Sequence, residues 1–335
     1  MRMRVLHLVD DTTAGGVMQV VRHLTTDDGH AAIADHRIAE VRRGSLSLPE
    51  LDADVIVSHL TVAWRCLPAL ALLRLRSRGR LLIHVEHSYT AGFVRHNVKR
   101  RGRFMAMLRL AYSRFDRVVA VSAAQSSWLL RNTLVRKGNL RLIRSCTDLS
   151  KTAALPPATG PVRHFGAIGR LERQKGFDLL IAAFRQTTDP DLRLTIFGTG
   201  SEQQSLAQLA GGDNRITFAG HTDTPAEVYA QVDAVIMPSR WEAYGLVAVE
   251  TLCAGRRLIC ADVDGLRDHA DLGAFIVPEI TVQSFTQAQN DTDGRLDGAW
   301  TAQRLMRENL LAWHGLLSEA RKPRMTEALE LAEEA

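Results

Sequence analysis

The sequence predicts an α/β fold with two domains, each built on a parallel sheet. Short apolar runs alternate with segments of helical periodicity along most of the chain, a pattern typical of βαβ units. With 335 residues, of which 46% are hydrophobic, the chain is also long enough to form two hydrophobic cores. The runs that we expect to form strands are 4–9, 54–58, 81–86, 117–122, 162–168, 192–198, 216–220, 234–239 and 257–261.

A stretch rich in proline and glycine divides the chain. In "KTAALPPATGP", residues 151–161, three prolines and a glycine interrupt any regular element, so we expect the interdomain linker there. This places an N-terminal domain over 1–155, a C-terminal domain over 156–300 and a helical tail over 301–335. The strand pattern fades after residue 280, and the tail ends in the acidic segment "ALELAEEA". The sequence leaves open whether the tail returns to the N-terminal domain.

Charge is distributed unevenly between the two halves. Residues 1–150 contain 24 Lys and Arg against 12 Asp and Glu, a net of +12, whereas the remainder contains 18 against 25, a net of −7. We therefore expect the basic half to face an anionic partner, which is a phosphate group, a nucleic acid or a membrane surface.

The cysteines indicate a reducing compartment. Cys66, Cys146, Cys253 and Cys260 have no CxxC or metal-site spacing, and they lie in or near apolar runs. The N-terminal apolar run is too short for a signal peptide, and no stretch approaches the roughly 18 apolar residues of a spanning helix. We expect a cytoplasmic protein.

Loops that follow strands are candidate sites, because open α/β sheets bind ligands at the carboxyl ends of their strands. After the first strand, Gly15 and Gly16 open a helix, whose N-terminal amides suit an anion. After the first strand of the second half, Arg170 and Lys175 precede another helix, and together they suit a diphosphate. Each pattern is also compatible with a plain turn or a solvated basic loop.

The run "PSRWEAYGLVAVETLCAG", residues 238–255, carries two carboxylates where a buried strand gives way to a helix. We expect Glu242 in the loop and Glu250 about two turns along the helix, so that the pair suits the hydroxyls of two sugar rings. The alternative is a surface acid and a capping acid. It fits poorly, because Glu250 lies in an apolar run where an unpaired charge is costly. The backbone amides that suit the intervening phosphates belong to Tyr244, Gly245 and Leu246.

These residues give the chain a family resemblance. It resembles the retaining glycosyltransferases of the GT-B fold, in particular glycosyltransferase family 4, also called group 1, whose signature is E-x7-E. The segments "GG" after the first strand, "VEHS", "VVAVS", "GRLERQKG", "IFGTGSE" and "ITFAG" occur in the family's order. The resemblance covers about residues 3–280 and is most specific over 163–262. It implies two Rossmann-like domains facing each other across a cleft, with the acceptor in the N-terminal domain and a nucleotide sugar in the C-terminal one.

The resemblance also implies a role for each site residue. Glu242 is expected to bind hydroxyls of the donor sugar and Glu250 the ribose hydroxyls, while Arg170 and Lys175 neutralise the diphosphate leaving group. His87 is expected beside the transferred sugar and the acceptor. The remaining donor-binding positions are Gly15, Gly16, Gly198, Gly200, Tyr244, Gly245 and Leu246.

Enzymes of this family transfer a sugar with retention of configuration and typically need no metal or other cofactor, since cations and helix dipoles stabilise the leaving group. The leaving diphosphate helps to deprotonate the acceptor hydroxyl, so we expect no dedicated nucleophile. The chain departs from the family at 264–268, "DGLRD", where a Gly-Gly pair and a glutamate are common. The region after residue 280 is also atypical.

The basic region 95–117 has eight Arg or Lys and one acid. As a helix from about residue 103, it would be amphipathic and suited to an anionic lipid surface; the alternative is that its apolar face packs on the sheet. We expect the membrane role, on the inner face of the plasma membrane, with a polyprenyl-diphosphate-linked saccharide as acceptor. Nucleic acid is not expected, because the region lacks interleaved aromatics and any recognition module. The residues of the apolar face are Phe104, Met107, Leu108, Ala111 and Phe115.

The leading hypothesis is a glycosyltransferase of exopolysaccharide or other surface-glycan synthesis. One alternative is an epimerase or hydrolase of the same fold, which would turn over the donor without an acceptor. The other is a non-catalytic, nucleotide-sugar-binding membrane scaffold, which would bind the nucleotide without turnover.

Overall fold

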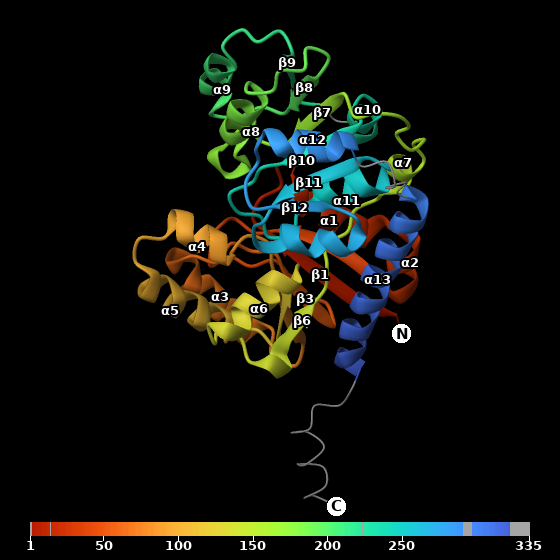
Figure 1. The fold of residues 1–335 in the computed structure, drawn as a ribbon. Coiled ribbons are helices and arrows are strands. Elements are labelled where there is room, and N and C mark those ends of the chain that lie inside the picture. Colours follow the sequence, from red (N-terminus) through yellow and green to blue (C-terminus); the bar gives the residue numbers. More distant parts are fainter. Residues whose placement is uncertain (1, 14, 223, 291–296, 322–335) are drawn as a thin grey trace, which may run out of the picture.

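The chain forms two parallel sheets of six strands each. The computed structural model describes residues 2–13, 15–222, 224–290 and 297–321. The first sheet has the order β2-β1-β3-β4-β5-β6 and the second the order β12-β11-β10-β7-β8-β9. Neighbouring strands run parallel in both. The predicted α/β class is therefore confirmed, and Figure 1 shows the second sheet above the first.

All nine runs expected to form strands contain one. The strands of the first sheet are β1 (Met3–Val9), β2 (Ala34–Glu40), β3 (Val55–Ser58), β4 (Leu81–Glu86), β5 (Arg117–Ala120) and β6 (Leu140–Leu142). Those of the second are β7 (His164–Ile168), β8 (Arg193–Phe197), β9 (Ile216–Gly220), β10 (Ala234–Met237), β11 (Arg257–Ala261) and β12 (Phe275–Val277).

The strands absent from the sequence prediction are β2, β6 and β12, and each lies at a sheet edge. An edge strand has one partner and one open side, so its sequence need not be continuously apolar. The β2 sequence, "ADHRIAE", is mostly half-buried or exposed for this reason. β6 and β12 have three residues each, which is too short to give a pattern.

Helices cover both faces of each sheet. They are α1 (Gly16–Thr26), α2 (Asp28–Ile33), α3 (Leu67–Arg76), α4 (Ala91–Asn97), α5 (Arg101–Tyr112), α6 (Ala123–Arg131), α7 (Ser150–Ala153), α8 (Phe177–Phe184), α9 (Gln203–Ala210), α10 (Pro225–Ala230), α11 (Leu246–Cys253), α12 (Val282–Asn290) and α13 (Gly298–Ser318). Short 3-10 segments are η1 (Trp64–Cys66), η2 (Lys137–Asn139), η3 (Arg173–Lys175), η4 (Asp264–Leu272) and η5 (Glu319–Arg321). None of the described helices is long and apolar enough to cross a bilayer.

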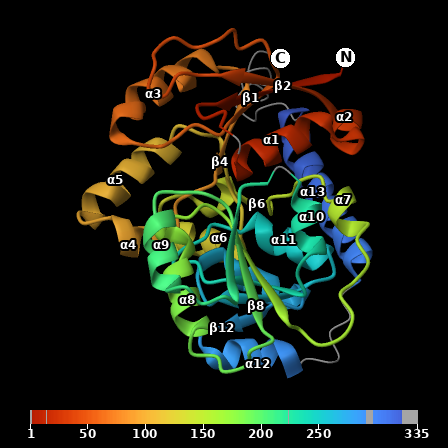
Figure 2. The ribbon, with the colours of Figure 1, turned by 90° about the horizontal axis from the view of Figure 1, so that it is seen from above.

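Side chains alternate between the two faces of the first sheet, so a separate hydrophobic cluster lies on each face. Val5, Val57 and Ile83 point to one face, where they pack with α1 and α13. Leu6, Ile56 and Leu82 point to the other face, where they pack with α3 and α5. Figure 2 shows α3 and α5 on the opposite side of the sheet from α1 and α13.

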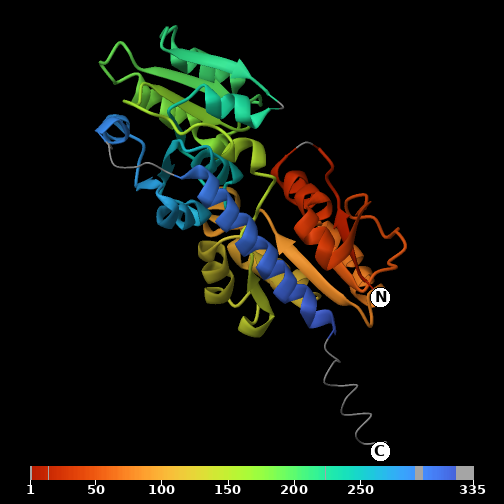
Figure 3. The same ribbon diagram turned by 90° about the vertical axis from the view of Figure 1, so that its right-hand side faces the viewer.

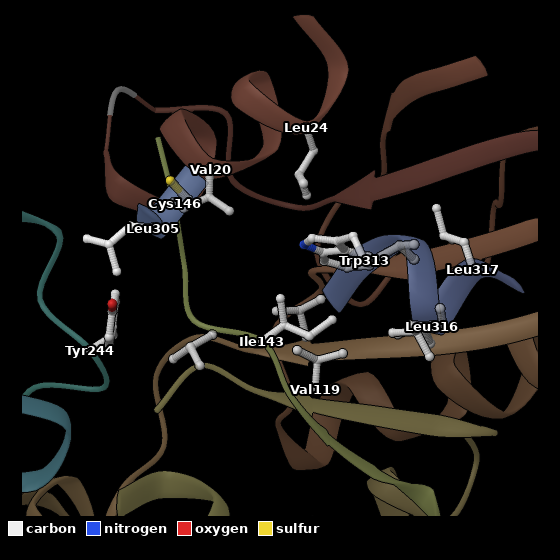
Figure 4. Packing of buried hydrophobic residues seen from close by; sticks show 14 of the residues in the cluster. Val20, Leu24, Val119, Ile143, Cys146, Tyr244, Leu305, Trp313, Leu316 and Leu317 are labelled. Atoms are coloured by element: carbon white, nitrogen blue, oxygen red, sulfur yellow. The ribbon is translucent and has the colours of Figure 1, made fainter. Parts of the chain in front are cut away.

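Helix α13 follows the second sheet in sequence but packs against the first. Figure 3 shows it running from the second sheet down along the first. Trp313, Leu316 and Leu317 on α13 are buried beside Val119 of β5 and Ile143, which directly follows β6 (Figure 4). Just beyond the helix, the Glu319 carboxylate accepts hydrogen bonds from Arg117 Nε at 2.6 Å and Arg141 Nη2 at 2.7 Å. The acidic end predicted at 328–335 lies outside the described residues.

The same cluster includes residues of the second half of the chain. Tyr244 and Cys253, at either end of α11, are buried in it together with Val249. α11 in turn packs along α13. The cluster therefore joins the first sheet to α11, which itself packs on β10 and β11, and in this way it links the two sheets.

We predict that α13 contributes strongly to stability. Leu316→Ala removes a side chain that is 2% exposed, so we expect the free energy of unfolding to fall by about 2–5 kcal/mol. The control is the same substitution at Leu311, which lies on the same helix but is 57% exposed; its effect should stay within about 0.5 kcal/mol. Urea unfolding of both variants measures this. Equal losses at the two positions would contradict the packing described for α13.

Candidate functional site

The site lies where loops from the two sheets meet. In each sheet the strand order reverses once, between β1 and β3 and between β7 and β10, and ligands of such sheets bind where the order reverses. The loop after β1 ends at Gly15, the N-cap of α1, and at Gly16. A Cβ added to Gly16 would lie 3.1 Å from Leu246 Cδ1 at the start of α11. The N-terminal glycine loop and the start of α11 therefore face each other closely.

A cavity of about 360 Å³ lies beside this contact. Four of the predicted site residues are among its lining: Gly15, Gly16, His87 and Arg170. The cavity is formed mostly by the ends of β1, β3 and β4, to which Arg170 is added from the second sheet. The other predicted residues lie outside the described lining of this cavity. The structure therefore brings residues of both halves together, with the N-terminal half contributing most of the surface.

The loop after β7 carries both predicted cations. Gly176 ends η3 with φ of +67°, and a Cβ there would collide with the Pro238 carbonyl, so only glycine fits between the two loops. This close approach brings Lys175 to the loop after β10. Its Nζ donates to Glu242 Oε2 at 2.6 Å, and the two side chains are 15% and 13% exposed. Two residues predicted separately from the sequence thus form one ion pair.

Gly198 and Gly200 follow β8 and pack closely against the backbone of the loop that carries Arg170. Gly198 has φ of +134°, and a Cβ on it would collide with the Gly169 carbonyl; a Cβ on Gly200 would collide with the Leu171 carbonyl. The Leu171 amide donates to the Thr199 carbonyl at 2.9 Å. The two glycines therefore hold the Arg170 loop in place through backbone contact, and direct contact with a donor stays a prediction.

Glu250 lies on α11 and is almost completely buried. It is 8% exposed, and its Oε2 accepts a hydrogen bond from the Tyr229 hydroxyl at 2.8 Å. Burial raises the pKa of Glu250 to about 7, and the Tyr229 hydrogen bond only partly opposes this shift. Hydrogen bonds donated by a ligand's hydroxyls would favour the ionised form of this carboxyl and would offset part of the cost of its burial.

Tyr244 is a packing residue as well as a predicted donor contact. Its ring is buried in the cluster that joins the sheets and lies 4.7 Å from the His269 ring, centroid to centroid. Its carbonyl accepts from His269 Nε2 at 2.8 Å. Gly245 follows as the N-cap of α11 with φ of +92°. The tyrosine side chain thus anchors the turn, and binding by the amides of Tyr244, Gly245 and Leu246 stays a prediction.

Two family models match the chain, one in each half. The model described as "Glycosyltransferase Family 4" matches residues 28–151, and that described as "Glycosyl transferases group 1" matches residues 162–291. Together they match most of the chain.

The chain belongs to the group 1, or family 4, glycosyltransferases.

Curated relatives match over part of their length. The chain is 34% identical over 161 residues to a glycogen synthase of Mycobacterium tuberculosis, covering 45% of this chain and 38% of the relative. It is 30% identical over 166 residues to the lipopolysaccharide core biosynthesis mannosyltransferase LpsB of Rhizobium meliloti, covering 45% and 46%. The chain thus spans less than half the length of these relatives.

Solved structures match over nearly the whole chain. HepE of Anabaena, in complex with UDP and glucose, has a TM-score of 0.69 at 16% identity and covers 95% of this chain and 98% of its own. Sucrose-phosphate synthase of Thermosynechococcus elongatus has a TM-score of 0.71 at 19% identity, covering 99% and 100%. These likenesses confirm the predicted fold of two Rossmann-like domains.

The segment that departs from the family pattern contacts the N-terminal half. Asp264 accepts hydrogen bonds from Thr90 Oγ1 at 2.6 Å and from the Gly92 amide at 2.9 Å. Asp268 accepts from the Ala123 amide at 2.8 Å and from Arg144 Nε at 3.0 Å. Sequence reasoning did not assign these aspartates a role. The partners lie more than 120 residues away in sequence, so no local pattern indicated them.

The predicted apolar face of 104–115 is buried against the first sheet. Met107, Leu108, Ala111 and Phe115 are at most 4% exposed and belong to a core cluster, while Phe104 packs at its margin. The apolar face is therefore not available to a membrane, and the expectation that it lies on a lipid surface is wrong. The cations of the region remain at the surface; they include Arg95, Lys99, Arg100, Arg101, Arg103 and Arg109.

We predict a pH-dependent cost of burying Glu250. Its folded pKa of about 7 lies above its ordinary 4.5, so the protein loses stability as the pH rises from about 4.5 to 7. Glu250→Gln keeps an acceptor for Tyr229 but cannot ionise. We expect it to raise the free energy of unfolding at pH 8 by about 2 kcal/mol, with little gain near pH 4.

Denaturant unfolding at the two pH values measures this difference. Glu227→Gln, which alters an exposed carboxyl of the same half, is the control and should show no such gain. If Glu250→Gln changed the free energy of unfolding by the same amount at both pH values, the proposed cost of ionising the buried carboxyl would be contradicted.

Proposed function

We propose that this protein transfers a sugar, with retention of configuration, from a uridine-diphosphate sugar to an acceptor hydroxyl. The observation that carries the proposal is the Lys175–Glu242 pair, 2.6 Å apart, with Arg170 in the neighbouring cavity and the glycine loop of α1 opposite. A cation next to a carboxylate suits a ligand that carries phosphate and sugar side by side. The choice of UDP rests on structural neighbours whose complexes contain UDP or UDP-glucose.

In this proposal the bound ligand separates Lys175 from Glu242, and each side chain then contacts a different part of the ligand. Lys175 and Arg170 take the diphosphate, whose charge grows as the bond to the sugar breaks, and Glu242 accepts hydrogen bonds from the sugar hydroxyls. Glu250 holds the ribose, and the N-terminus of α11 adds a favourable dipole at the phosphates. The proposed domain division, 1–155 for the acceptor, 156–300 for the donor and a tail over 301–335, follows this arrangement.

The chemical step balances without a protein nucleophile. The bond from the anomeric carbon to the diphosphate oxygen breaks, a bond to the acceptor oxygen forms on the same face, and the acceptor proton passes to the leaving diphosphate. The side chains therefore bind, orient and stabilise charge. No metal or other cofactor enters this scheme.

For the acceptor we propose a polyprenyl-diphosphate-linked saccharide, in exopolysaccharide or other surface-glycan synthesis. The support is the basic surface of α4 and α5, where Leu110 is also 41% exposed, which suits attachment to the inner face of the plasma membrane through charge. One relative is a lipopolysaccharide core mannosyltransferase, and one structural neighbour is a lipopolysaccharide outer core galactosyltransferase.

The test is transfer of radiolabelled sugar from a UDP-sugar, in EDTA, with and without bacterial lipid extract. We expect transfer in EDTA, dependent on the extract, and a fall in kcat of at least about 100-fold for Glu242→Ala. Glu308→Ala, which removes an exposed carboxylate of α13, is the matched control and should keep full activity. Wild-type rates in Glu242→Ala would contradict its role.

The other outcomes separate the alternatives. UDP release without an acceptor product would favour an epimerase or hydrolase. Tight UDP binding with no turnover in any extract would favour a non-catalytic scaffold. A product formed equally without lipid would contradict the lipid-linked acceptor and leave the transferase in place.

A further inference from the structure

Four imidazole rings form a hydrogen-bonded row across the first sheet. His36 is on β2, His7 is on β1, and His59 and His87 directly follow β3 and β4. These strands are neighbours in the sheet in that order. Consecutive rings are 5.3, 5.3 and 5.2 Å apart, centroid to centroid, with interplanar angles of 22–27°. The row begins at the edge of the sheet and ends at His87, in the lining of the cavity.

Each contact in the row joins Nε2 of one ring to Nδ1 of the next ring. His87 Nε2 meets His59 Nδ1 at 2.8 Å, His59 Nε2 meets His7 Nδ1 at 3.0 Å, and His7 Nε2 meets His36 Nδ1 at 3.0 Å. A neutral imidazole has one N–H and one acceptor nitrogen. Each contact needs one of each, so all four rings must share the same tautomer. A change of tautomer at one ring therefore requires a change at every ring.

Burial keeps these rings neutral near pH 7. It lowers the pKa of His87 to about 4 and that of His7 to about 3, and it also lowers those of His59 and His36. Each neutral ring therefore has one donor nitrogen and one acceptor nitrogen, whereas in an imidazolium both nitrogens would donate. Among the described residues there is also no group of three side chains suited to a metal ion, so the row is not explained as a metal site.

The two ends of the row differ in their surroundings. At the outer end, Nε2 of His36 is buried and has no hydrogen-bond partner among the described side chains and backbone. At the inner end, His87 contributes to the lining of the cavity. The shared tautomer is either Nε2–H in all four rings, which makes Nδ1 of His87 an acceptor, or Nδ1–H in all four, which makes it a donor.

We propose that His36, His7 and His59 are positioning residues that hold the His87 ring in a single tautomer, so that its Nδ1 has one fixed hydrogen-bonding role towards the cavity. Since Nε2 of His87 is engaged by His59, Nδ1 is the nitrogen left for a molecule in the cavity. A hydroxyl that meets this nitrogen must take the complementary role in the hydrogen bond, and it can take no other. The inference rests on the proposed function only for the identity of that hydroxyl, which belongs to the donor sugar or the acceptor.

The direct test is nuclear magnetic resonance of protein labelled with ¹⁵N-histidine, where long-range proton–nitrogen correlations identify each tautomer. We expect one and the same tautomer for all four rings of the wild-type protein. In His7→Leu the row is cut, so His59 and His87 should become mixtures of tautomers, while His164, which bonds Thr195 in the second sheet, should be unchanged. A mixture of tautomers in the four wild-type rings, rings that differ in tautomer, or a His87 that does not respond to His7→Leu would overturn the proposal.

Transfer kinetics give a second readout. His7→Gln can accept from His59 and donate to His36 through its amide, whereas His7→Leu can do neither. We expect His7→Leu to lower kcat by about tenfold or more, by analogy with the outer-shell partners of metal-ligating histidines, with KM for the donor changed by less than about threefold. His7→Gln should recover most of the loss. Equal losses in both variants, or none in either, would contradict the proposal.

Two controls keep the outcomes distinct. If His7→Leu does not fold, His36→Leu at the half-buried outer end removes the same alignment, and the same tautomer mixture is expected at His87. If no UDP-sugar is bound or turned over, the proposed function fails, yet the tautomers of the four rings still decide the inference.

Discussion

The site depends on the apolar cluster that joins the two sheets. A cleft between two separately folded sheets holds its geometry only if their relative position is fixed, and here residues of β1, β3, β4 and β5 share one cluster with α11 and α13. Because α13 packs on the first sheet and α11 packs on α13, the element that carries Glu250 is held against the N-terminal half. Tyr244 belongs to the same cluster, so the turn that precedes α11 is fixed as well. Residues that we propose for binding therefore lie on elements that also stabilise the fold.

Within that frame, close backbone contact places the charged side chains. Gly176 meets the Pro238 carbonyl, and Gly198 meets the Gly169 carbonyl, so three loops of the second sheet lie closer than any side chain would allow. This brings Lys175 to Glu242 and directs Arg170 towards the N-terminal cavity. The aspartates at 264 and 268 then bond to the N-terminal half on the other side of the cleft.

Much of the fold could be predicted from sequence because buried strands of parallel sheets are continuous apolar runs. The strands that escaped prediction lie at edges, where burial no longer dictates the sequence. Lys175 and Glu242 were each predicted as site residues from a motif resemblance, but their contact was not, because it depends on how closely the loops after β7 and β10 approach each other. The histidine row could not be predicted: His7, His36, His59 and His87 are spread over 81 positions of the sequence, and only the strand order places them in contact. The expectation that the apolar face of 104–115 meets a membrane was wrong for a related reason, because an amphipathic helix has the same pattern whether that face meets a sheet or a lipid.

The central claim is that this cleft recognises the diphosphate of a nucleotide sugar through its own cations. Isothermal titration of UDP and of UMP, in EDTA, into the wild-type protein and Arg170→Gln measures it directly. The account predicts that UDP binds the wild-type protein at least about tenfold more tightly than UMP, a difference of about 1.4 kcal/mol, and that Arg170→Gln loses most of this preference. Equal affinities for the two nucleotides in the wild-type protein, or a preference for UDP that survives in the variant, would contradict it.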